Sequence, residues 1–89
     1  MKKVKEKIAY IGLSHLGINY AASASEHNYN IICYDENKNL INKFISNKIP
    51  ISEPGLSRVL SKNKKKIIFT NNVKEIYNCK IVFISYDIA

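Results

Sequence analysis

The sequence predicts an α/β fold built on a parallel sheet, and two features support this. Four short, nearly all-apolar segments have the length of buried strands; they span residues 8–11, 31–34, 67–70 and 81–84. Segments with helical spacing of apolar residues lie between them, as βαβ units require. At 89 residues the chain fits one small domain, without an internal repeat or an interdomain linker.

The first half of the chain predicts a strand, a helix and a second strand. The strand 8–11 runs into Gly12, and a helix is expected from Leu16 to about His27. Its predicted apolar face follows three- and four-residue steps through Leu16, Tyr20, Ala21 and Ala24. Small residues should let this helix lie close to a sheet; they are Gly17, Ala21, Ala22 and Ser25. After a turn at 28–30, the strand 31–34 ends beside Asp35.

The second half predicts shorter helices. Asn37 is expected to cap a helix whose apolar face contains Leu40, Ile41, Phe44 and Ile45. Residues 47–54 are loop-like, and 55–60 predict a short helix that turns inward Leu56, Val59 and Leu60. A helical turn through Tyr77, capped by Asn71 or Asn72, should follow the strand 67–70.

Right-handed crossovers limit how four such strands can be ordered. The simplest order is 3-2-1-4, which places a topological switch point beside the first strand. The prediction is therefore a doubly wound parallel sheet, four strands in order 3-2-1-4 with flanking helices, as part of a larger domain. The last strand would then be an exposed edge, and self-association into a homo-oligomer is one expected consequence.

Composition narrows the classes of partner and compartment. The formal net charge is +7, but the one dense lysine cluster, Lys62–Lys66, has no interleaved aromatic residues. A solvated turn is preferred over a phosphate-binding patch, and no nucleic-acid partner is expected. No apolar run is long enough to span a bilayer, and no signal-peptide pattern follows the basic N-terminus. We therefore expect a cytoplasmic protein without a membrane partner.

The two cysteines are interpreted as structural. Cys33 and Cys79 each lie beside an apolar strand, so both are expected to be small buried core residues. A disulfide is not expected in a cytoplasmic chain. Two isolated cysteines without a Cys-x-x-Cys motif or a histidine pair do not predict a metal site.

The strongest functional signal is the segment 12–17, which reads Gly-Leu-Ser-His-Leu-Gly between a strand and a helix. The dinucleotide fingerprint Gly-x-Gly-x-x-Gly occurs in that context. Gly12 is placed to make the tight turn, and Gly17 to let helix and strand pack closely. Ser14 replaces the middle glycine, where it adds bulk but can donate a hydrogen bond. The helix N-terminus would supply amide donors to phosphates.

Asp35 strengthens this interpretation, because it ends the second strand at about the spacing expected after the glycine loop. A carboxylate there can accept both adenosine ribose hydroxyls and would repel a 2′-phosphate, and Glu36 adds to the repulsion. The predicted cofactor is NAD rather than NADP. A solvated strand-end acid or a helix cap is the alternative for Asp35. His15 is interpreted as a loop side chain near the cofactor or in solvent, not as a catalytic group.

A second segment makes the assignment more specific. Residues 49–56 read Ile-Pro-Ile-Ser-Glu-Pro-Gly-Leu, and they resemble the Pro-Ile-x-Glu-Pro-Gly-Leu stretch of the UDP-glucose/GDP-mannose dehydrogenase family. The segments 7–13, 69–70 and 81–85 are similar to that family too, so the resemblance covers nearly the whole chain. By its residues alone, 49–56 is a Pro/Gly-fixed turn that starts a helix.

The resemblance implies the N-terminal part of an NAD-binding Rossmann domain over residues 1–89, from an enzyme of nucleotide-sugar metabolism such as polysaccharide biosynthesis. Family members oxidise the C6 hydroxyl of a nucleotide sugar to a carboxylate with NAD. Their catalytic cysteine and sugar-nucleotide domain lie beyond this length, so no catalytic residue is expected here. Carried over residue by residue, the cofactor site comprises Gly12, Ser14, His15, Leu16, Gly17 and Asp35, with Ser85 and Tyr86 beside the adenosine.

Some positions depart from the family pattern. Ser14 replaces the middle glycine, His15 replaces the usual tyrosine, and Leu40 replaces a common basic residue, with Lys38 nearby. The ending 86–89 differs as well. Two other interpretations stay open. One is a stand-alone Rossmann-like nucleotide-binding or regulatory module without catalysis; the other is a related hydroxyacid or hydroxyacyl dehydrogenase, a class that generally lacks the 49–56 pattern.

Overall fold

The computed structural model describes residues 6–27, 29–49 and 53–86. Within these ranges strands and helices alternate, in the order β1 (Lys7–Ile11), α1 (His15–Glu26), β2 (Asn30–Tyr34), α2 (Lys38–Ile45), α3 (Leu56–Lys62), β3 (Ile67–Thr70), the 3-10 helix η1 (Val73–Ile76) and β4 (Ile81–Ile84). Every predicted strand and helical segment is confirmed. The predicted turn at Asn28, residues 50–52 of the family-like segment and the divergent ending 87–89 lie outside the described residues.

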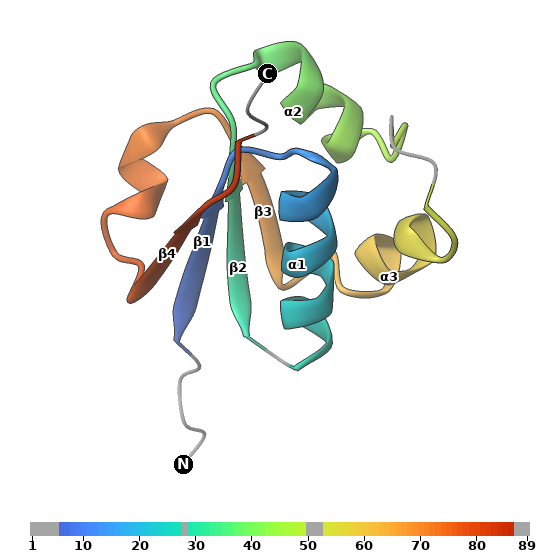
Figure 1. The fold of residues 1–89 in the computed structure, drawn as a ribbon, viewed down its shortest axis with the longest axis horizontal. Coiled ribbons are helices and arrows are strands. Elements are labelled where there is room, and N and C mark those ends of the chain that lie inside the picture. The colour runs from blue at the N-terminus through green and yellow to red at the C-terminus, as the bar shows by residue number, and fades with distance from the viewer. Residues whose placement is uncertain (1–5, 28, 50–52, 87–89) are drawn as a thin grey trace.

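The strands form one parallel sheet in the predicted order, β3-β2-β1-β4 (Figure 1). β1 is central, because Ile8 pairs with Ile31 of β2 on one side and with Ile81 of β4 on the other. Ile31 pairs in turn with Ile67 of β3. Since all four strands are parallel, their carboxyl ends meet at one end of the sheet, which is where ligands bind in open α/β sheets.

One face of the sheet carries most of the core. α1 and α2 lie over that face, α3 lies on the same side and packs mainly against α1, and η1 lies on the opposite side (Figure 1). Ile8, Ile31 and Cys33 of the sheet pack there against helical residues. Burial raises the pKa of the Cys33 thiol, which is a core residue as predicted. The same prediction was wrong for Cys79, which is only half-buried because it lies in the turn before the edge strand β4.

α1 faces the sheet with a different set of residues from the predicted one. Leu16 and Tyr20 are 53% and 54% exposed, so the predicted apolar face was wrong at both positions. The buried residues of α1 are Gly17, Ile18, Ala21, Ala22 and Ser25, which include all four small residues expected to permit close packing. A helix that lies this close to a sheet has no room for a tyrosine at the interface, so its small side chains turn inward.

α2 has the predicted cap, and its predicted apolar face is correct at the centre. Asn37 Oδ1 accepts a hydrogen bond from Leu40 N at 3.1 Å. Ile41 and Phe44 are buried. Ile45 is 62% exposed, contrary to prediction. The reason is that this eight-residue helix packs mainly on the edge strand β3 and presents a narrow inward face.

α3 begins at Leu56, directly after Gly55, whose left-handed backbone conformation favours glycine. Gly55 has φ +80°, which agrees with the predicted Pro/Gly turn. The helix ends at Lys62, two residues beyond its predicted end. Leu56 and Leu60 are buried as expected, while Val59 is half-buried. None of the helices within 6–27, 29–49 and 53–86 is long and apolar enough to cross a membrane.

Asn63 ties α3 to α1. It is 3% exposed, and its Nδ2 donates to Ser25 Oγ at 3.1 Å and to Glu26 Oε1 at 3.2 Å. Lys62 Nζ lies 3.4 Å from Glu26 Oε2, and this hydrogen bond lowers the pKa of the Glu26 carboxyl. Residues 64–65 beside them are exposed, so the lysine cluster forms a turn at the surface, as predicted.

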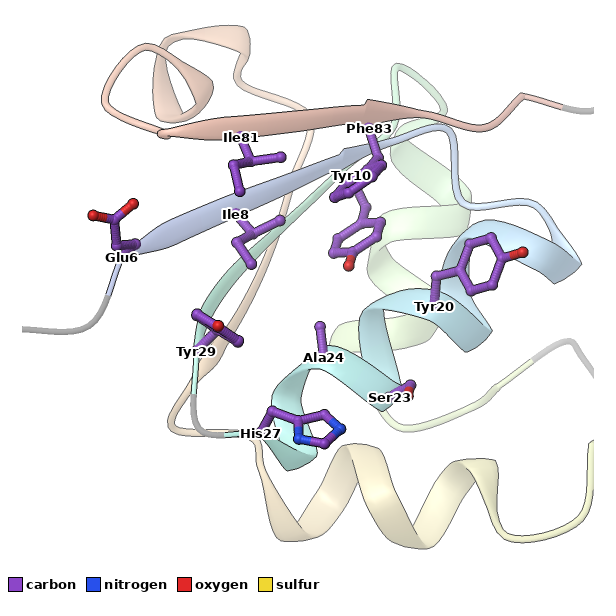
Figure 2. Close-up of a pocket in the computed structure, with 10 residues that line it drawn as sticks. All are labelled: Glu6, Ile8, Tyr10, Tyr20, Ser23, Ala24, His27, Tyr29, Ile81 and Phe83. Atoms are coloured by element: carbon purple, nitrogen blue, oxygen red, sulfur yellow. The ribbon is translucent and has the colours of Figure 1, made fainter.

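β4 is an outer edge of the sheet, and its four side chains are all exposed, as the predicted topology requires. A groove of about 730 Å³ opens beside it on the α1 side (Figure 2). Ile8 and Tyr10 of β1 line this groove together with Ile81 and Phe83 of β4. The Tyr10 and Phe83 rings stack with their centroids 5.2 Å apart. An apolar sheet face therefore remains open next to the edge strand.

Removing the Asn63 side chain should loosen the contact between α1 and α3. We expect Asn63→Ala to lower the free energy of unfolding by about 1–3 kcal/mol, the usual loss when buried polar groups lose a hydrogen-bonding partner. Urea unfolding followed by circular dichroism measures this change. Asn71→Ala, at an exposed position, is the matched control and should change stability by less than about 0.5 kcal/mol. Equal effects of the two substitutions would contradict the role of Asn63.

Candidate functional site

The candidate site begins at the glycine loop, where β1 leads into α1. Gly12 follows β1 with φ +93°, a conformation that residues with a Cβ rarely adopt. Its N–H donates to the Tyr34 carbonyl oxygen at 2.9 Å, which continues the pairing of β1 with β2 by one residue. The tight turn predicted at this glycine is therefore present.

Gly17 sets how closely α1 approaches the loop. A Cβ at this position would overlap the Gly12 carbonyl oxygen and come within 2.5 Å of Ser85 Oγ. Both approaches are well inside van der Waals contact, so only glycine fits without a shift of the backbone. The close helix–strand packing predicted for this glycine is confirmed.

Ser14 is the N-cap of α1. Its Oγ accepts a hydrogen bond from Gly17 N at 3.1 Å and donates one to the Ser85 carbonyl oxygen at 2.5 Å. The hydrogen-bond donation predicted for Ser14 is therefore made to the Ser85 carbonyl oxygen, which takes the single proton of the hydroxyl. The cap leaves the first amides of the helix, those of His15 and Leu16, without intrahelical partners.

The side chains of His15 and Leu16 are exposed. His15 Nε2 lies 3.3 Å from Glu53 Oε1, so the family-like segment touches the glycine loop. Sequence reasoning missed this contact, although the Glu-Pro-Gly-Leu motif had singled out Glu53. With both side chains turned toward solvent, the two residues can serve an anion mainly through their backbone N–H groups.

Asp35 links the end of β2 to the glycine loop. It is 7% exposed; its Oδ2 accepts from Leu13 N at 2.9 Å, and its Oδ1 accepts from Asn37 N at 2.9 Å. The alternative that Asp35 is a solvated acid is therefore wrong. The alternative that Asp35 caps a helix is partly right, because Asp35 accepts from the backbone of Asn37, which is the N-cap residue of α2. Each carboxylate oxygen has two lone pairs, so each keeps one acceptor position beyond these contacts.

Ser85 and Tyr86 directly follow β4. Ser85 Oγ donates to the Gly12 carbonyl oxygen at 3.2 Å, so Ser85 fastens β4 to the loop, a role that the sequence did not predict. The Tyr86 ring lies against Gly12, because a Cβ added to Gly12 would come 2.8 Å from Tyr86 Cγ. The structure thus gathers the predicted cofactor residues at the carboxyl ends of β1, β2 and β4.

The groove beside β4 is separate from this site. None of the eight predicted cofactor residues lines it (Figure 2). Leu40 packs against the hydrophobic core, and Lys38 is exposed at the start of α2. Among residues 6–27, 29–49 and 53–86, no three His, Cys, Asp or Glu side chains come together as metal ligands would.

Comparisons with known proteins agree with this geometry. Residues 6–87 match the NAD binding domain of the UDP-glucose/GDP-mannose dehydrogenase family. UDP-glucose 6-dehydrogenase TuaD of Bacillus subtilis is 31% identical over 70 residues, which are 76% of this chain and 15% of TuaD. UDP-D-ManNAc dehydrogenase from Pyrococcus horikoshii superposes with a TM-score of 0.86 at 26% identity, over 90% of this chain and 20% of that one. GDP-mannose dehydrogenase from Pseudomonas aeruginosa superposes with a TM-score of 0.85 at 25% identity, over 92% of this chain and 20% of that one.

The chain therefore spans only 15% to 20% of the length of these relatives. The shared part contains the four-stranded parallel sheet with its flanking helices, as the sequence predicted. The family match extends over nearly all of the described residues. This chain belongs to the UDP-glucose/GDP-mannose dehydrogenase family and is part of its NAD-binding Rossmann domain.

Proposed function

We propose that this chain forms the adenosine- and pyrophosphate-binding part of the NAD site in a nucleotide-sugar 6-dehydrogenase, which oxidises a UDP- or GDP-sugar to the uronic acid. The hydrogen bond from Leu13 N to Asp35 Oδ2, 2.9 Å long, is the observation that carries the proposal. It holds the phosphate loop next to the acidic residue, as dinucleotide binding requires. The dehydrogenases of UDP-glucose, UDP-D-ManNAc and GDP-mannose among the relatives support the substrate class.

The residues at the strand ends fit the adenosine half of a dinucleotide. The backbone N–H groups of His15 and Leu16 would bind the pyrophosphate, helped by the partial positive charge at the helix N-terminus. The lone pairs left on Asp35 would accept the two ribose hydroxyls, and its charge, next to that of Glu36, would repel the 2′-phosphate of NADP. The capping bonds of Ser14 would hold the loop in shape, rather than bind phosphate directly.

NAD, when bound, supplies the acceptor for hydride from the sugar carbon. We place the groups that bind the nucleotide sugar and act on it in other parts of a full-length enzyme, because this chain spans 15% to 20% of its relatives. We also propose a cytoplasmic enzyme, since NAD and nucleotide sugars are cytoplasmic metabolites. Its uronic-acid product would supply polysaccharide biosynthesis.

Asp35→Asn tests the ribose contact. The amide oxygen can still accept from Leu13 N, but the negative charge is lost and the amide Nδ2 cannot accept from Asn37 N. We expect NAD to bind roughly ten- to a hundredfold more weakly, as for the loss of a charged hydrogen bond, and the preference for NAD over NADP to narrow. NMR titration of the labelled chain with each cofactor measures both effects. Glu75→Gln, on exposed η1, should leave both affinities unchanged. Equal binding of NAD and NADP by the wild type would contradict the assignment.

We further propose that the β4 edge is a contact surface. The side chains of Ile81, Val82, Phe83 and Ile84 are between 42% and 74% exposed, and the outer backbone groups of an edge strand have no ladder partner. For the 89-residue chain by itself, the partner that this surface fits is a second copy, which gives a homo-oligomer. In a full-length enzyme, further strands of the same domain would occupy this edge.

Val82→Lys should reduce this self-association, because a charged side chain on an edge strand disfavours pairing. We expect the dissociation constant of the dimer to rise roughly tenfold, which corresponds to about 1.4 kcal/mol. Sedimentation velocity over a concentration series measures it. Val73→Lys makes the same change on η1, at a position 48% exposed, and should leave association unaltered. A wild-type chain that stays monomeric at all concentrations would rule the contact out.

A further inference from the structure

Tyr86 places its ring on the first glycine of the loop. A Cβ added to Gly12 would lie 2.8 Å from Tyr86 Cγ, 2.8 Å from the Tyr86 backbone N and 2.9 Å from Cδ1, so both the ring and the main chain of Tyr86 lie against Gly12. Tyr86 is 44% exposed, which means that the ring covers the loop from outside and is not part of the core. The aromatic residue therefore lies across the carboxyl end of β1.

The charges at the end of β2 act on the Tyr86 side chain. Burial raises the pKa of the Tyr86 phenol, and the nearby Asp35 and Glu36 carboxylates raise it further. The side chain thus covers Gly12 at the end of β1 and lies within electrostatic range of Asp35. The glycine loop and Asp35 are the two groups that an adenosine diphosphate would have to bridge.

Asp35 is less accessible than a ribose ligand should be. It is 7% exposed, although each of its oxygens keeps one free acceptor position. The backbone contacts with Leu13 and Asn37 account for part of this burial. A ribose that approaches Asp35 over Gly12 would meet the Tyr86 ring, which lies on this glycine.

We propose that Tyr86 is a specificity- and affinity-determining residue of the cofactor site, whose ring competes with the adenosine half of NAD for the space between Gly12 and Asp35. This proposal rests on the proposed assignment of Asp35 to the ribose. NAD binds after the ring rotates away from Gly12. The position of Tyr86 at the surface, directly after the last residues of β4, leaves the ring free to make that rotation without disturbing the core.

The competition weakens the observed affinity by a predictable factor. When the binding-competent conformation is only fractionally populated, the apparent dissociation constant is the intrinsic constant divided by that fraction. Removing the ring should therefore make the apparent dissociation constant for NAD equal to the intrinsic one. If the open conformation makes up roughly a tenth of the chains, Tyr86→Ala should bind NAD about tenfold more tightly than the wild type.

The test compares NAD binding by the whole 89-residue chain and by three variants, measured by calorimetry and NMR titration. Tyr86→Ala should tighten NAD and AMP by the same factor and leave nicotinamide mononucleotide unchanged, because only the adenosine half meets the ring. Tyr86→Phe keeps the ring on Gly12 and removes only the phenol oxygen, so it should show much less of this tightening than Tyr86→Ala. Tyr77→Ala is the matched control, since Tyr77 is 73% exposed and precedes the amino end of β4, whereas Gly12 follows the carboxyl end of β1.

The outcomes separate this inference from the proposed function. If the wild type binds NAD and Tyr86→Ala binds it equally or more weakly, the ring does not compete with NAD. That result would contradict the role of Tyr86 but not the proposed NAD site. If neither the wild type nor Tyr86→Ala binds NAD or AMP at millimolar concentration, both the role of Tyr86 and the proposed NAD site are wrong. Amide dispersion in the NMR spectrum confirms that each variant is folded. Tyr86→Ser gives the same comparison if the alanine variant loses that dispersion.

Discussion

The close approach of Gly17 to the Gly12 carbonyl is the constraint on which the candidate site depends. No Cβ fits between α1 and the loop, so α1 lies as near to β1 as a helix can. This approach places the helix N-terminus at the carboxyl end of the central strand. Hydrogen bonds of Ser14 and Ser85 then fix the loop from two sides. The amides at the N-terminus of α1 are positioned by this packing, by the two serine side chains and by the bond from Leu13 N to Asp35 Oδ2.

Asp35 shows how one residue can serve both the fold and a ligand. Its two oxygens each accept one backbone N–H, and the bond to Leu13 N spans 22 residues of sequence. A carboxylate has acceptor capacity beyond these two bonds, so the same group can hold the loop and still receive a ribose. The arrangement also explains why the acid is buried, since its structural partners surround it before any cofactor arrives.

The strand order and the glycine positions could be predicted from sequence because they follow local rules. All-apolar strands, right-handed crossovers and the spacing of Gly12, Gly17 and Asp35 are readable without tertiary contacts. The inward face of α1 was wrong at Leu16 and Tyr20 because the side of the helix that faces the sheet is the one that carries four small residues together with Ile18. The contacts of Ser85 and Tyr86 with the glycine loop were not predicted, because their partners Ser14 and Gly12 lie more than 70 residues away in the sequence.

Gly17→Ala tests the central constraint most directly. The labelled variant would be compared with the wild type by NMR and by urea unfolding, with NAD titrated into both. The added methyl must displace the Gly12 carbonyl, so we expect large shifts at the Gly12 and Ser85 amides, a loss of about 1–3 kcal/mol of stability and weaker NAD binding. A variant with wild-type amide positions, stability and NAD affinity would show that the close approach does not set the site.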